Sequence, residues 1–328
     1  MIGVYHGGDL ASATREFGCP TDGWLDLSTG INPLPWSVPP RMFESLYCLP
    51  DSEQIEMLNT AAAEAYGIEE IGCIACGPGS QALIQWLPRL RDKCRVAVFA
   101  PTYGEHAHAW RAAGHNVFET SSMPNAGECE IAVLTRPNNP DGTSIEIDAV
   151  AGLAADLEKK GGFVLVDEAF ADLDPVASIC AGGWAGIIAL RSFGKFYGLP
   201  GLRLGFAIAD SETTESLRSA LGPWPVSSLA AMVGAAALVD KTWQTETRNR
   251  LALSSGQLDS ILEAAGLDIV GGTHLFRLVI SSNARAIHEK LARAGIFTRY
   301  FPENPRWLRF GLPGKKDDWE RLEKAFGL

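Results

Sequence analysis

The sequence has no excess of basic residues. Its 328 residues include 28 lysines and arginines against 39 aspartates and glutamates, a formal net charge of −11 at pH 7. Proteins that bind long polyanions displace counterions with clustered basic side chains. No basic stripe is visible in this chain, so we expect neither nucleic acid nor an anionic membrane surface as a partner.

The sequence also lacks long hydrophobic runs. No apolar run reaches the roughly 18 residues expected of a membrane-spanning helix. The first residues have no basic region followed by an apolar one, as a secretory signal would have. Seven scattered cysteines, an odd number, do not suggest a disulfide framework. Together these features predict a reduced, cytoplasmic protein.

Metal-ligand clusters are scarce too. Cys73 and Cys76 have the spacing of a CxxC motif, but no second pair accompanies them. A single CxxC in an apolar run is a weak metal signal, and two small buried residues of a strand explain it better. We therefore predict no metal site.

The sequence does carry a pattern of alternating strands and helices. Several short apolar runs are continuous rather than alternating, as in strands covered on both faces. The expected strands are 71–76, 96–100, 131–135, 163–166, 187–190 and 204–209. Helical patterns lie between them, at 52–66, 82–90, 105–113 and 147–159. Strands that alternate with helices predict an α/β protein with a mostly parallel sheet.

The chain ends differ from this central block. The first 40 residues are irregular, rich in glycine and proline, and carry Trp24 and Trp36. A break at Pro223-Trp224-Pro225 precedes a long helical stretch at about 228–265 and a run of shorter strands and helices. We predict an N-terminal arm at 1–40 that packs with the small domain, a large domain at 41–222 and a small α+β domain at 223–328.

Glycine-rich and charged motifs follow the predicted strands, where open α/β sheets place their ligand sites. Gly77-Pro78-Gly79-Ser80-Gln81 separates a strand from a helix, and it suits either phosphate binding or a tight turn. The segment 136–142, with Asn139 between prolines, suits either a rigid polar donor or a turn. Asp167 ends an apolar strand, as a capping residue or as a partly buried carboxylate that needs a cation.

The last motif is the most specific. Lys195 lies among aromatic residues and glycines, three positions after Ser192, and Arg203 follows eight positions later. Most lysines are solvated, whereas a desolvated lysine has a lowered pKa and forms Schiff bases. In this order and at these separations, the motifs resemble those of the fold-type I, pyridoxal-phosphate-dependent aminotransferases of class I/II. The resemblance covers nearly the whole chain.

The resemblance implies a three-layer αβα fold, with a seven-stranded sheet and a smaller C-terminal domain, and pyridoxal 5'-phosphate as cofactor. It implies two catalytic residues: Lys195 would bond to the cofactor aldehyde, and Asp167 would pair with the ring nitrogen. Tyr103 would stack on the ring, and Asn139 would bind its phenolic oxygen near the substrate carboxylate. The phosphate would be held by Gly79, Ser80, Gln81, Ser192 and Arg203.

Within the family, the N-terminal arm resembles a decarboxylase branch more than an aminotransferase branch. Gly30-Ile31-Asn32-Pro33 stands where the aminotransferase branch has Asn-Glu-Asn-Pro. The resemblance then implies decarboxylation of O-phospho-L-threonine to (R)-1-amino-2-propanol O-2-phosphate in cobalamin biosynthesis. The substrate would be bound by His6, Gly7, Asn32, Asn139, Arg299 and Arg309, with the phosphate at Arg299 and the carboxylate at Arg309.

Other readings of the same residues remain open. An aminotransferase acting on a phosphorylated substrate such as histidinol phosphate would use the same constellation. A non-catalytic partner subunit of cobalamin biosynthesis would keep the fold alone. The family also implies a homodimer, although Leu49 replaces a tyrosine that in relatives reaches the partner's cofactor phosphate. Two further departures are Phe170, where a tyrosine is usual, and Gly194, where many relatives have serine.

Overall fold

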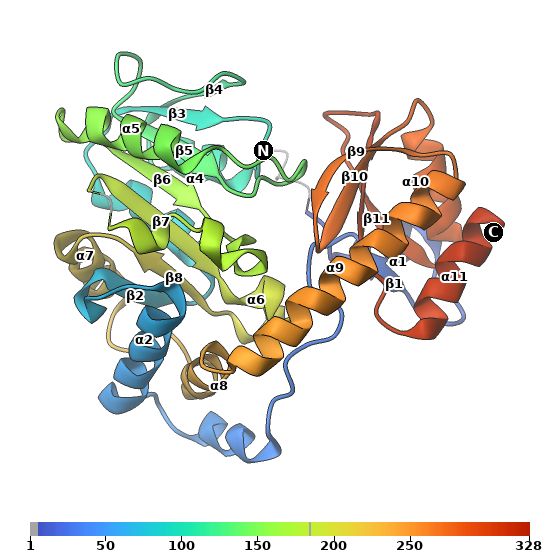
Figure 1. Ribbon diagram of the computed structural model, residues 1–328, viewed down its shortest axis with the longest axis horizontal. Coiled ribbons are helices and arrows are strands. Elements are labelled where there is room, and N and C mark those ends of the chain that lie inside the picture. The colour runs from blue at the N-terminus through green and yellow to red at the C-terminus, as the bar shows by residue number, and fades with distance from the viewer. Residues whose placement is uncertain (1–5, 184) are drawn as a thin grey trace. The chain divides into compact units, whose positions relative to one another are not determined.

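The computed structural model describes residues 6–183 and 185–328 of the chain (Figure 1). The chain divides into two compact units. The large unit comprises Trp36–Asn139 and Thr143–Gln244, and the small unit comprises residues 6–35, 140–142 and 245–328. The large unit thus extends to Gln244, beyond the expected boundary at residue 222. The N-terminal arm ends at Pro35 rather than at the expected residue 40.

The large unit is built on a seven-stranded sheet (Figure 1). The strand order is β2-β8-β7-β6-β5-β3-β4. The contacts from β7 through β6, β5 and β3 to β4 are all parallel, and β8 runs antiparallel to both of its neighbours. The strands are β2 (Ile74–Gly77), β3 (Arg95–Phe99), β4 (Asn116–Thr120), β5 (Ile131–Thr135), β6 (Phe163–Asp167), β7 (Ile187–Ser192) and β8 (Gly205–Ile208). The predicted mostly parallel, seven-stranded sheet is confirmed.

Helices cover both faces of this sheet. On one face, Leu165 of β6 belongs to the same buried cluster as Ile84 and Trp110 from two of the helices. On the other face, Phe206 of β8 packs edge-on against Tyr66, with ring centroids 5.7 Å apart. The helices are α2 (Ser52–Tyr66), α3 (Ser80–Trp86), α4 (Glu105–Ala112), α5 (Ile147–Glu158), α6 (Phe193–Phe196), α7 (Ser211–Leu221) and α8 (Ser228–Leu238). Short 3₁₀ turns join them, η1 (Pro40–Tyr47), η2 (Ile71–Cys73), η3 (Leu87–Leu90), η4 (Ala171–Leu173), η5 (Pro175–Ala177), η6 (Cys180–Gly182) and η7 (Pro200–Leu202).

The small unit has a five-stranded sheet in the order β1-β11-β12-β10-β9. Its strands are β1 (Leu25–Leu27), β9 (Asp268–Thr273), β10 (Phe276–Ile280), β11 (Ile296–Tyr300) and β12 (Trp307–Gly311). The helices are α1 (Leu10–Phe17), α10 (Ala284–Arg293), α11 (Lys316–Phe326) and most of α9 (Lys241–Ala264). The arm joins this sheet directly, because β1 pairs in parallel with β11, Leu25 opposite Ile296.

Several elements differ from the sequence-based expectation. The stretch 228–265 is two helices, because Asp240 ends the run between α8 and α9 and caps the second helix. Its Oδ1 accepts the N–H of Trp243 at 3.0 Å, and its Oδ2 accepts the indole N–H of Trp36 at 3.0 Å. The arm also contains α1, which Asp9 caps by accepting the N–H of Ser12. Strand β4 was missed because only part of its side-chain surface is buried.

The structure also bears on the Cys73–Cys76 pair and on the expectation that no helix spans a membrane. Cys76 is buried in β2, as expected, but Cys73 lies in η2 and is only half-buried. Across the residues that the structure describes, no helix combines the length and the apolar character needed to cross a membrane.

Candidate active site

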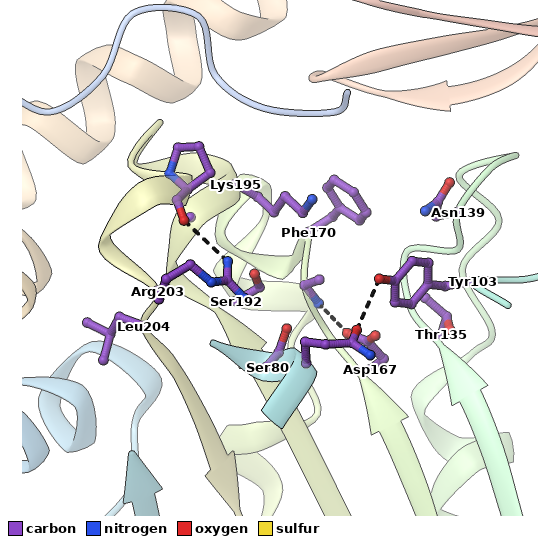
Figure 2. Close-up of a pocket in the computed structure, with 14 residues that line it drawn as sticks. Ser80, Tyr103, Thr135, Asn139, Asp167, Phe170, Ser192, Lys195, Arg203 and Leu204 are labelled. Carbon is purple, nitrogen blue, oxygen red and sulfur yellow. Dashed lines mark hydrogen bonds between the residues drawn. The ribbon is translucent and has the colours of Figure 1, made fainter. Parts of the chain in front are cut away.

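A pocket opens in the large unit where the parallel strands end (Figure 2). Its lining comes from the segments after β2, β3, β5, β6 and β7, which is where an open α/β sheet places a ligand. The lining residues are Ser80, Gln81, Tyr103, Thr135, Asn139, Asp167, Ala169, Phe170, Ser192, Gly194, Lys195, Pro200, Arg203 and Leu204. Eight of the residues predicted to bind the cofactor thus lie around one pocket, and the ninth, Gly79, adjoins it.

The carboxylate of Asp167 is buried and held by two donors. It is 4% exposed at the end of β6. Its Oδ1 accepts the N–H of Ala169 at 3.0 Å, and its Oδ2 lies 2.8 Å from Nε2 of His106. His106 is fully buried on α4, and its Nδ1 has no hydrogen-bond partner among the described residues. With a proton on Nε2, the imidazole donates to the carboxylate of Asp167 and fixes its orientation.

Lys195 reaches the pocket from α6, a helix of four residues directly after β7. Its Nζ lies 6.0 Å from the ring centre of Phe170, a side chain that is itself buried. Figure 2 shows both side chains pointing into the same space. Gly194 packs against η7: a Cβ at this position would lie 2.9 Å from Cα of Pro200. Glycine at this position avoids that contact.

Hydrogen bonds also fix the polar groups opposite Lys195. The hydroxyl of Tyr103 donates to Oε1 of Gln81 at 3.0 Å, and the Gln81 amide donates to Glu105 at 2.7 Å. The loop that carries Asn139 is held by its neighbour Asn138. The Asn138 amide donates to the carbonyl of Pro101 at 2.9 Å, and Thr102 donates to Oδ1 of Asn138 at 2.7 Å.

Backbone close approach forms a narrow cradle at the start of α3. Gly79 has φ +81°, and a Cβ there would lie 2.3 Å from Nη2 of Arg203. A Cβ on Gly205 would lie 2.3 Å from the backbone nitrogen of Ser80. Arg203 itself has φ 52°, the one positive φ of a non-glycine residue in the described part of the chain. Such strain is typical of functional sites, and here it lays the guanidinium over Gly79 beside Ser80.

The predicted substrate residues lie in the small unit, apart from Asn139. Arg299 on β11 and Arg309 on β12 are directly opposite each other in the strand register, and they are 8% and 6% exposed. Each guanidinium also lies over a phenylalanine ring, Phe301 and Phe276 respectively. Burial, then the charge of Arg299, lower the pKa of Arg309 to about 9. Like charges directly opposite each other repel, and the carboxylate of Asp26 acts on the pKa of Arg309 in the opposite direction.

The arm adds groups next to Arg309. The carbonyl of Ser28 accepts Nη2 of Arg309 at 2.7 Å. Gly7 lies against the same residue, since a Cβ at Gly7 would be 2.3 Å from that carbonyl oxygen. Asn32 is buried, and its Oδ1 accepts the N–H of Leu34 at 3.0 Å, whereas His6 is exposed. The structure therefore brings Gly7 and both arginines together, while Asn32 stabilises a turn.

Sequence reasoning missed two features of the pocket. His106 lies three residues after Tyr103, on the first turn of α4, and nothing in the pattern singled it out as the partner of Asp167. Arg191 interrupts an otherwise apolar strand directly before Ser192 and forms ion pairs with Glu168 and Asp172. A charged residue at a buried strand position was the available signal.

Known proteins resemble the chain over most of its length. The model of the family described as "Aminotransferase class I and II" matches residues 41–326. The chain belongs to this family. Curated relatives include the threonine-phosphate decarboxylase of Pseudomonas aeruginosa, 42% identical over 98% of this chain and 96% of that protein. A threonine-phosphate decarboxylase of a Sinorhizobium species is 40% identical, over 98% and 97%.

Solved structures of the same fold are more distant in sequence. The histidinol-phosphate aminotransferase from Clostridium acetobutylicum superposes with a TM-score of 0.81 at 20% identity, covering 92% of this chain and 98% of that chain. This likeness, together with the observed layers, confirms the predicted fold class. Membership of the class I and II aminotransferase family rests on the family model and on the full-length relatives.

The pocket residues fit the family's cofactor, pyridoxal 5'-phosphate. Its aldehyde calls for a primary amine, and Lys195 is the lysine in the lining. Its ring nitrogen calls for a buried carboxylate, which Asp167 supplies with a fixed orientation. Its phosphate calls for hydroxyl, backbone N–H and guanidinium donors, which Ser80, Ser192 and Arg203 bring to the glycine-lined cradle.

Proposed function

We propose that this protein is a pyridoxal-phosphate-dependent decarboxylase that converts O-phospho-L-threonine to (R)-1-amino-2-propanol O-2-phosphate in cobalamin biosynthesis. The observation that carries the proposal is the likeness, at 42% and 40% identity over nearly the whole chain, to two threonine-phosphate decarboxylases. The intact Lys195 and Asp167 favour an active enzyme over a non-catalytic subunit.

The large unit would hold the cofactor. Lys195 would bond to its aldehyde carbon and Asp167 to its ring nitrogen, with Tyr103 stacked on the ring and Asn139 at the phenolic oxygen. Gly79, Ser80, Gln81, Ser192 and Arg203 would bind the phosphate. When bound, the cofactor supplies an electron sink for the pair of electrons left at Cα by the departing carboxylate. The carboxylate of Asp167, oriented by His106, would keep the ring nitrogen protonated and so maintain that sink.

The small unit would hold the substrate's two anionic groups. A planar guanidinium matches a carboxylate or phosphate by paired hydrogen bonds. Arg309 would take the α-carboxylate and Arg299 the phosphate, and each anion relieves the repulsion between the two buried cations. His6, Gly7 and Asn32 would contact the same substrate from the arm. Two separate anchors orient the substrate, and this orientation decides which bond at Cα is broken.

Lys195 would have a second role after carbon dioxide leaves. Its primary amine is suited to carry a proton and would return it to Cα. The ring of Phe170, 6.0 Å from Nζ, adds an apolar wall without a hydroxyl donor. An apolar wall keeps water from competing for the proton at Cα.

The decisive experiment measures carbon dioxide. The holoenzyme is incubated with O-phospho-L-threonine and no keto acid, and gas release and the amino-alcohol phosphate are quantified together. We expect the two products in equal amounts. Conversion of the cofactor to its amine form without gas would refute the decarboxylase and favour an aminotransferase. A purified protein that shows no absorbance band of lysine-bound cofactor would support the non-catalytic alternative.

We further infer a homodimer and a cytoplasmic location. Apolar side chains stay exposed on one stretch of the large unit, around η1 and the start of α2: Phe43, Leu46, Tyr47, Leu49 and Met57. Tyr47 is 91% exposed, and exposed apolar groups that gather in one patch mark interaction sites. A second copy of the chain is the occupant that the family implies. Sedimentation of the wild-type protein and of the Leu46→Asp variant tests the homodimer. We expect the wild type to sediment as a dimer and the variant as a monomer.

A further inference from the structure

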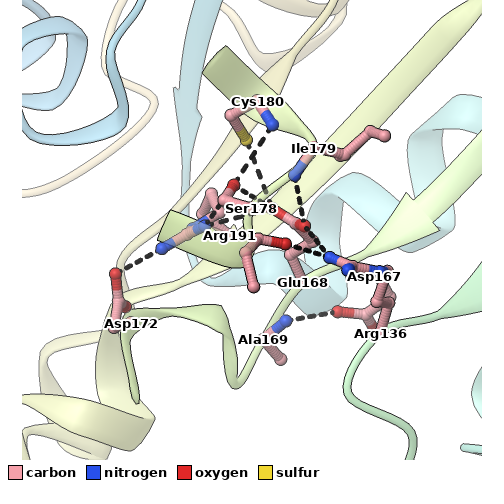
Figure 3. A network of polar contacts seen from close by, with 10 residues as sticks. Arg136, Asp167, Glu168, Ala169, Asp172, Ser178, Ile179, Cys180 and Arg191 are labelled. Atoms are coloured by element: carbon pink, nitrogen blue, oxygen red, sulfur yellow. Dashed lines mark hydrogen bonds and ion pairs between the residues drawn. The ribbon is translucent and has the colours of Figure 1, made fainter. Parts of the chain in front are cut away.

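A network of buried charges lies behind the pocket (Figure 3). Arg136, Glu168, Asp172 and Arg191 are all less than 8% exposed, and they carry two positive and two negative charges. Nη1 of Arg191 donates to Oε2 of Glu168 at 3.1 Å, and Nη2 donates to Asp172. Nη1 of Arg136 lies 3.7 Å from Oε1 of Glu168. The four charged residues therefore form one balanced cluster.

Each charged residue of the network adjoins a residue that lines the pocket. Three of these pairs are direct neighbours at the ends of adjacent parallel strands, and the fourth spans two positions on the loop after β6. The pairs are Thr135 with Arg136, Asp167 with Glu168, Ser192 with Arg191, and Phe170 with Asp172. A shift of the network would therefore move residues that contact the cofactor.

Side chains alternate between the two faces of a strand, and this places the charged network and the pocket-lining residues on opposite faces. Successive side chains of a strand point to opposite faces. Leu165 and Leu190 belong to the core that packs under α3 and α4, and Asp167 and Ser192 follow them by two positions on the same face. The guanidinium of Arg191 instead lies over the ring of Tyr66 on α2, 4.4 Å from its centre. The network thus joins the strand ends on the face opposite the pocket.

Glu168 is the hub of this network. Besides Arg191, its carboxylate accepts the hydroxyl of Ser178 at 2.5 Å, the N–H of Ile179 at 2.8 Å and the thiol of Cys180 at 3.4 Å. Burial, then the charge of Glu168, raise the pKa of the Cys180 thiol to about 12, so the thiol keeps its proton and donates. These hydrogen bonds to the carboxylate of Glu168 hold the segment from η5 to η6 against the end of β6.

Burying four charges contributes little to the free energy of unfolding. The desolvation of ions in a protein interior offsets most of their attraction, and apolar replacements are often as stable. What such a network does supply is a defined geometry, because each charge has few low-energy positions. We propose that the Glu168–Arg191–Asp172 network is a positioning device for the cofactor, which sets Asp167, Phe170 and Ser192 in register with Lys195. This inference rests on the proposed cofactor site and not on the identity of the substrate.

The substitution Glu168→Gln tests the proposal most sharply. Glutamine has the same shape, but its amide N–H₂ would face donors of Arg191 or Ile179 instead of accepting from them. We expect the dissociation constant of pyridoxal 5'-phosphate to rise about tenfold or more, since a poorly supported site loses its geometry. We also expect a changed circular dichroism of the bound cofactor. Titration of the apoprotein measures the first, and neither requires turnover.

The matched control is Asp259→Asn in the small unit. Asp259 and Arg277 form a two-point ion pair, with Nε to Oδ1 at 2.5 Å and Nη2 to Oδ2 at 2.9 Å. Its loss is expected to lower stability in urea without changing the cofactor's dissociation constant. If Glu168→Gln likewise lowers stability but leaves that constant and the dichroism unchanged, the network is merely structural and the proposal is overturned.

A milder variant covers the case in which Glu168→Gln does not fold. Asp172→Asn leaves the Arg191–Glu168 pair in place and removes the charge that holds η4, next to Phe170. We expect a smaller rise, about threefold to tenfold, in the cofactor's dissociation constant. An unchanged constant in a fully folded Asp172→Asn protein would contradict the proposal. Because all these readouts precede catalysis, they stand even if carbon dioxide release from O-phospho-L-threonine is not observed.

Discussion

The two units treat a buried arginine in opposite ways. In the large unit, burial alone would lower the pKa of Arg191, but Asp172 and Glu168 outweigh it and raise that pKa. In the small unit, burial and the neighbouring Arg299 act together and lower the pKa of Arg309 to about 9. One cation is neutralised by the fold, whereas the other is placed beside a second cation.

We infer from this difference that Arg191 supports the fold, whereas Arg299 and Arg309 bind a ligand. A neutralised charge needs no ligand, so Arg191 serves the structure that carries the pocket. Arg299 and Arg309 lie directly opposite each other across β11 and β12, where their like charges repel. We propose that this pair binds the carboxylate and phosphate of the substrate, although the chain as a whole has a net charge of −11. Net charge excludes long polyanions, but it does not exclude small anions met by local cations.

The largest effect is expected at Lys195 in the large unit. Lys195→Ala removes the amine that we propose bonds to the cofactor and returns a proton to Cα. We expect carbon dioxide release to fall at least about 10⁴-fold. The measurement is single-turnover gas release, and the absorbance band of lysine-bound cofactor should disappear as well. Unchanged activity would refute every pyridoxal mechanism for this chain.

The next effect is expected at Asp167. Asp167→Asn keeps the shape but removes the charge that holds the ring nitrogen protonated, so kcat should fall about a hundredfold or more. His106→Asn should lower kcat less, since the carboxylate remains and loses only its orientation. Steady-state kinetics with both variants measures the two effects. Equal losses in the two variants would show that His106 does more than position Asp167.

The third prediction concerns how the free energy of unfolding depends on pH, through His288 of the small unit. His288, buried in the small unit, has its pKa lowered to about 4 by burial, with Arg299 acting in the same direction and Glu289 opposing. An unfolded histidine takes its proton near pH 6.5, so the unfolded state binds more protons between these values. The free energy of unfolding should therefore be unaffected above about pH 6.5 and fall by about 3 kcal/mol as the pH drops to about 4. Urea titrations compare wild type with His288→Asn, which should lose less.

A fourth and smaller effect contrasts two glycines. Gly205→Ala in the large unit would place its Cβ 2.3 Å from the backbone nitrogen of Ser80. We expect a loss of about 1–3 kcal/mol in the free energy of unfolding, together with weaker cofactor binding. Gly256→Ala on α9 meets no atom within 4 Å and should gain up to about 1 kcal/mol. Thermal unfolding of the two variants measures the opposite signs.

Much of the large unit was predictable because its strands are continuous apolar runs with functional residues directly after them. Lys195, Asp167 and Asn139 were singled out at or after such strands, and Arg203 just before the next one. Their roles came from the family resemblance, and the structure places all four around one pocket. Helical periodicity did not reveal the break at Asp240. This residue caps α9 through the N–H of Trp243, and its other oxygen accepts the indole N–H of Trp36, far away in the sequence. Likewise, the His106–Asp167 contact joins α4 to β6, and no local pattern reports such a pairing.

The small unit was less predictable for a related reason. Its strand β1 lies in the arm and pairs with β11, more than 250 residues later in the chain, so its three residues carry little periodicity of their own. The opposition of Arg299 and Arg309 also follows from the register of β11 and β12 and not from spacing. Their roles came only from the family resemblance, and they stay predictions until binding is measured.

The paired arginines of the small unit, Arg299 and Arg309, are proposed to recognise the two anionic groups of the substrate. The direct measurement is the dissociation constant of O-phospho-L-threonine and of L-threonine for wild type and Arg299→Gln, followed by the cofactor's absorbance. We predict that the phosphorylated ligand binds the variant about a hundredfold more weakly, while L-threonine and the cofactor bind as before. Equal weakening for both ligands, or none for either, would contradict the assignment of the phosphate to Arg299.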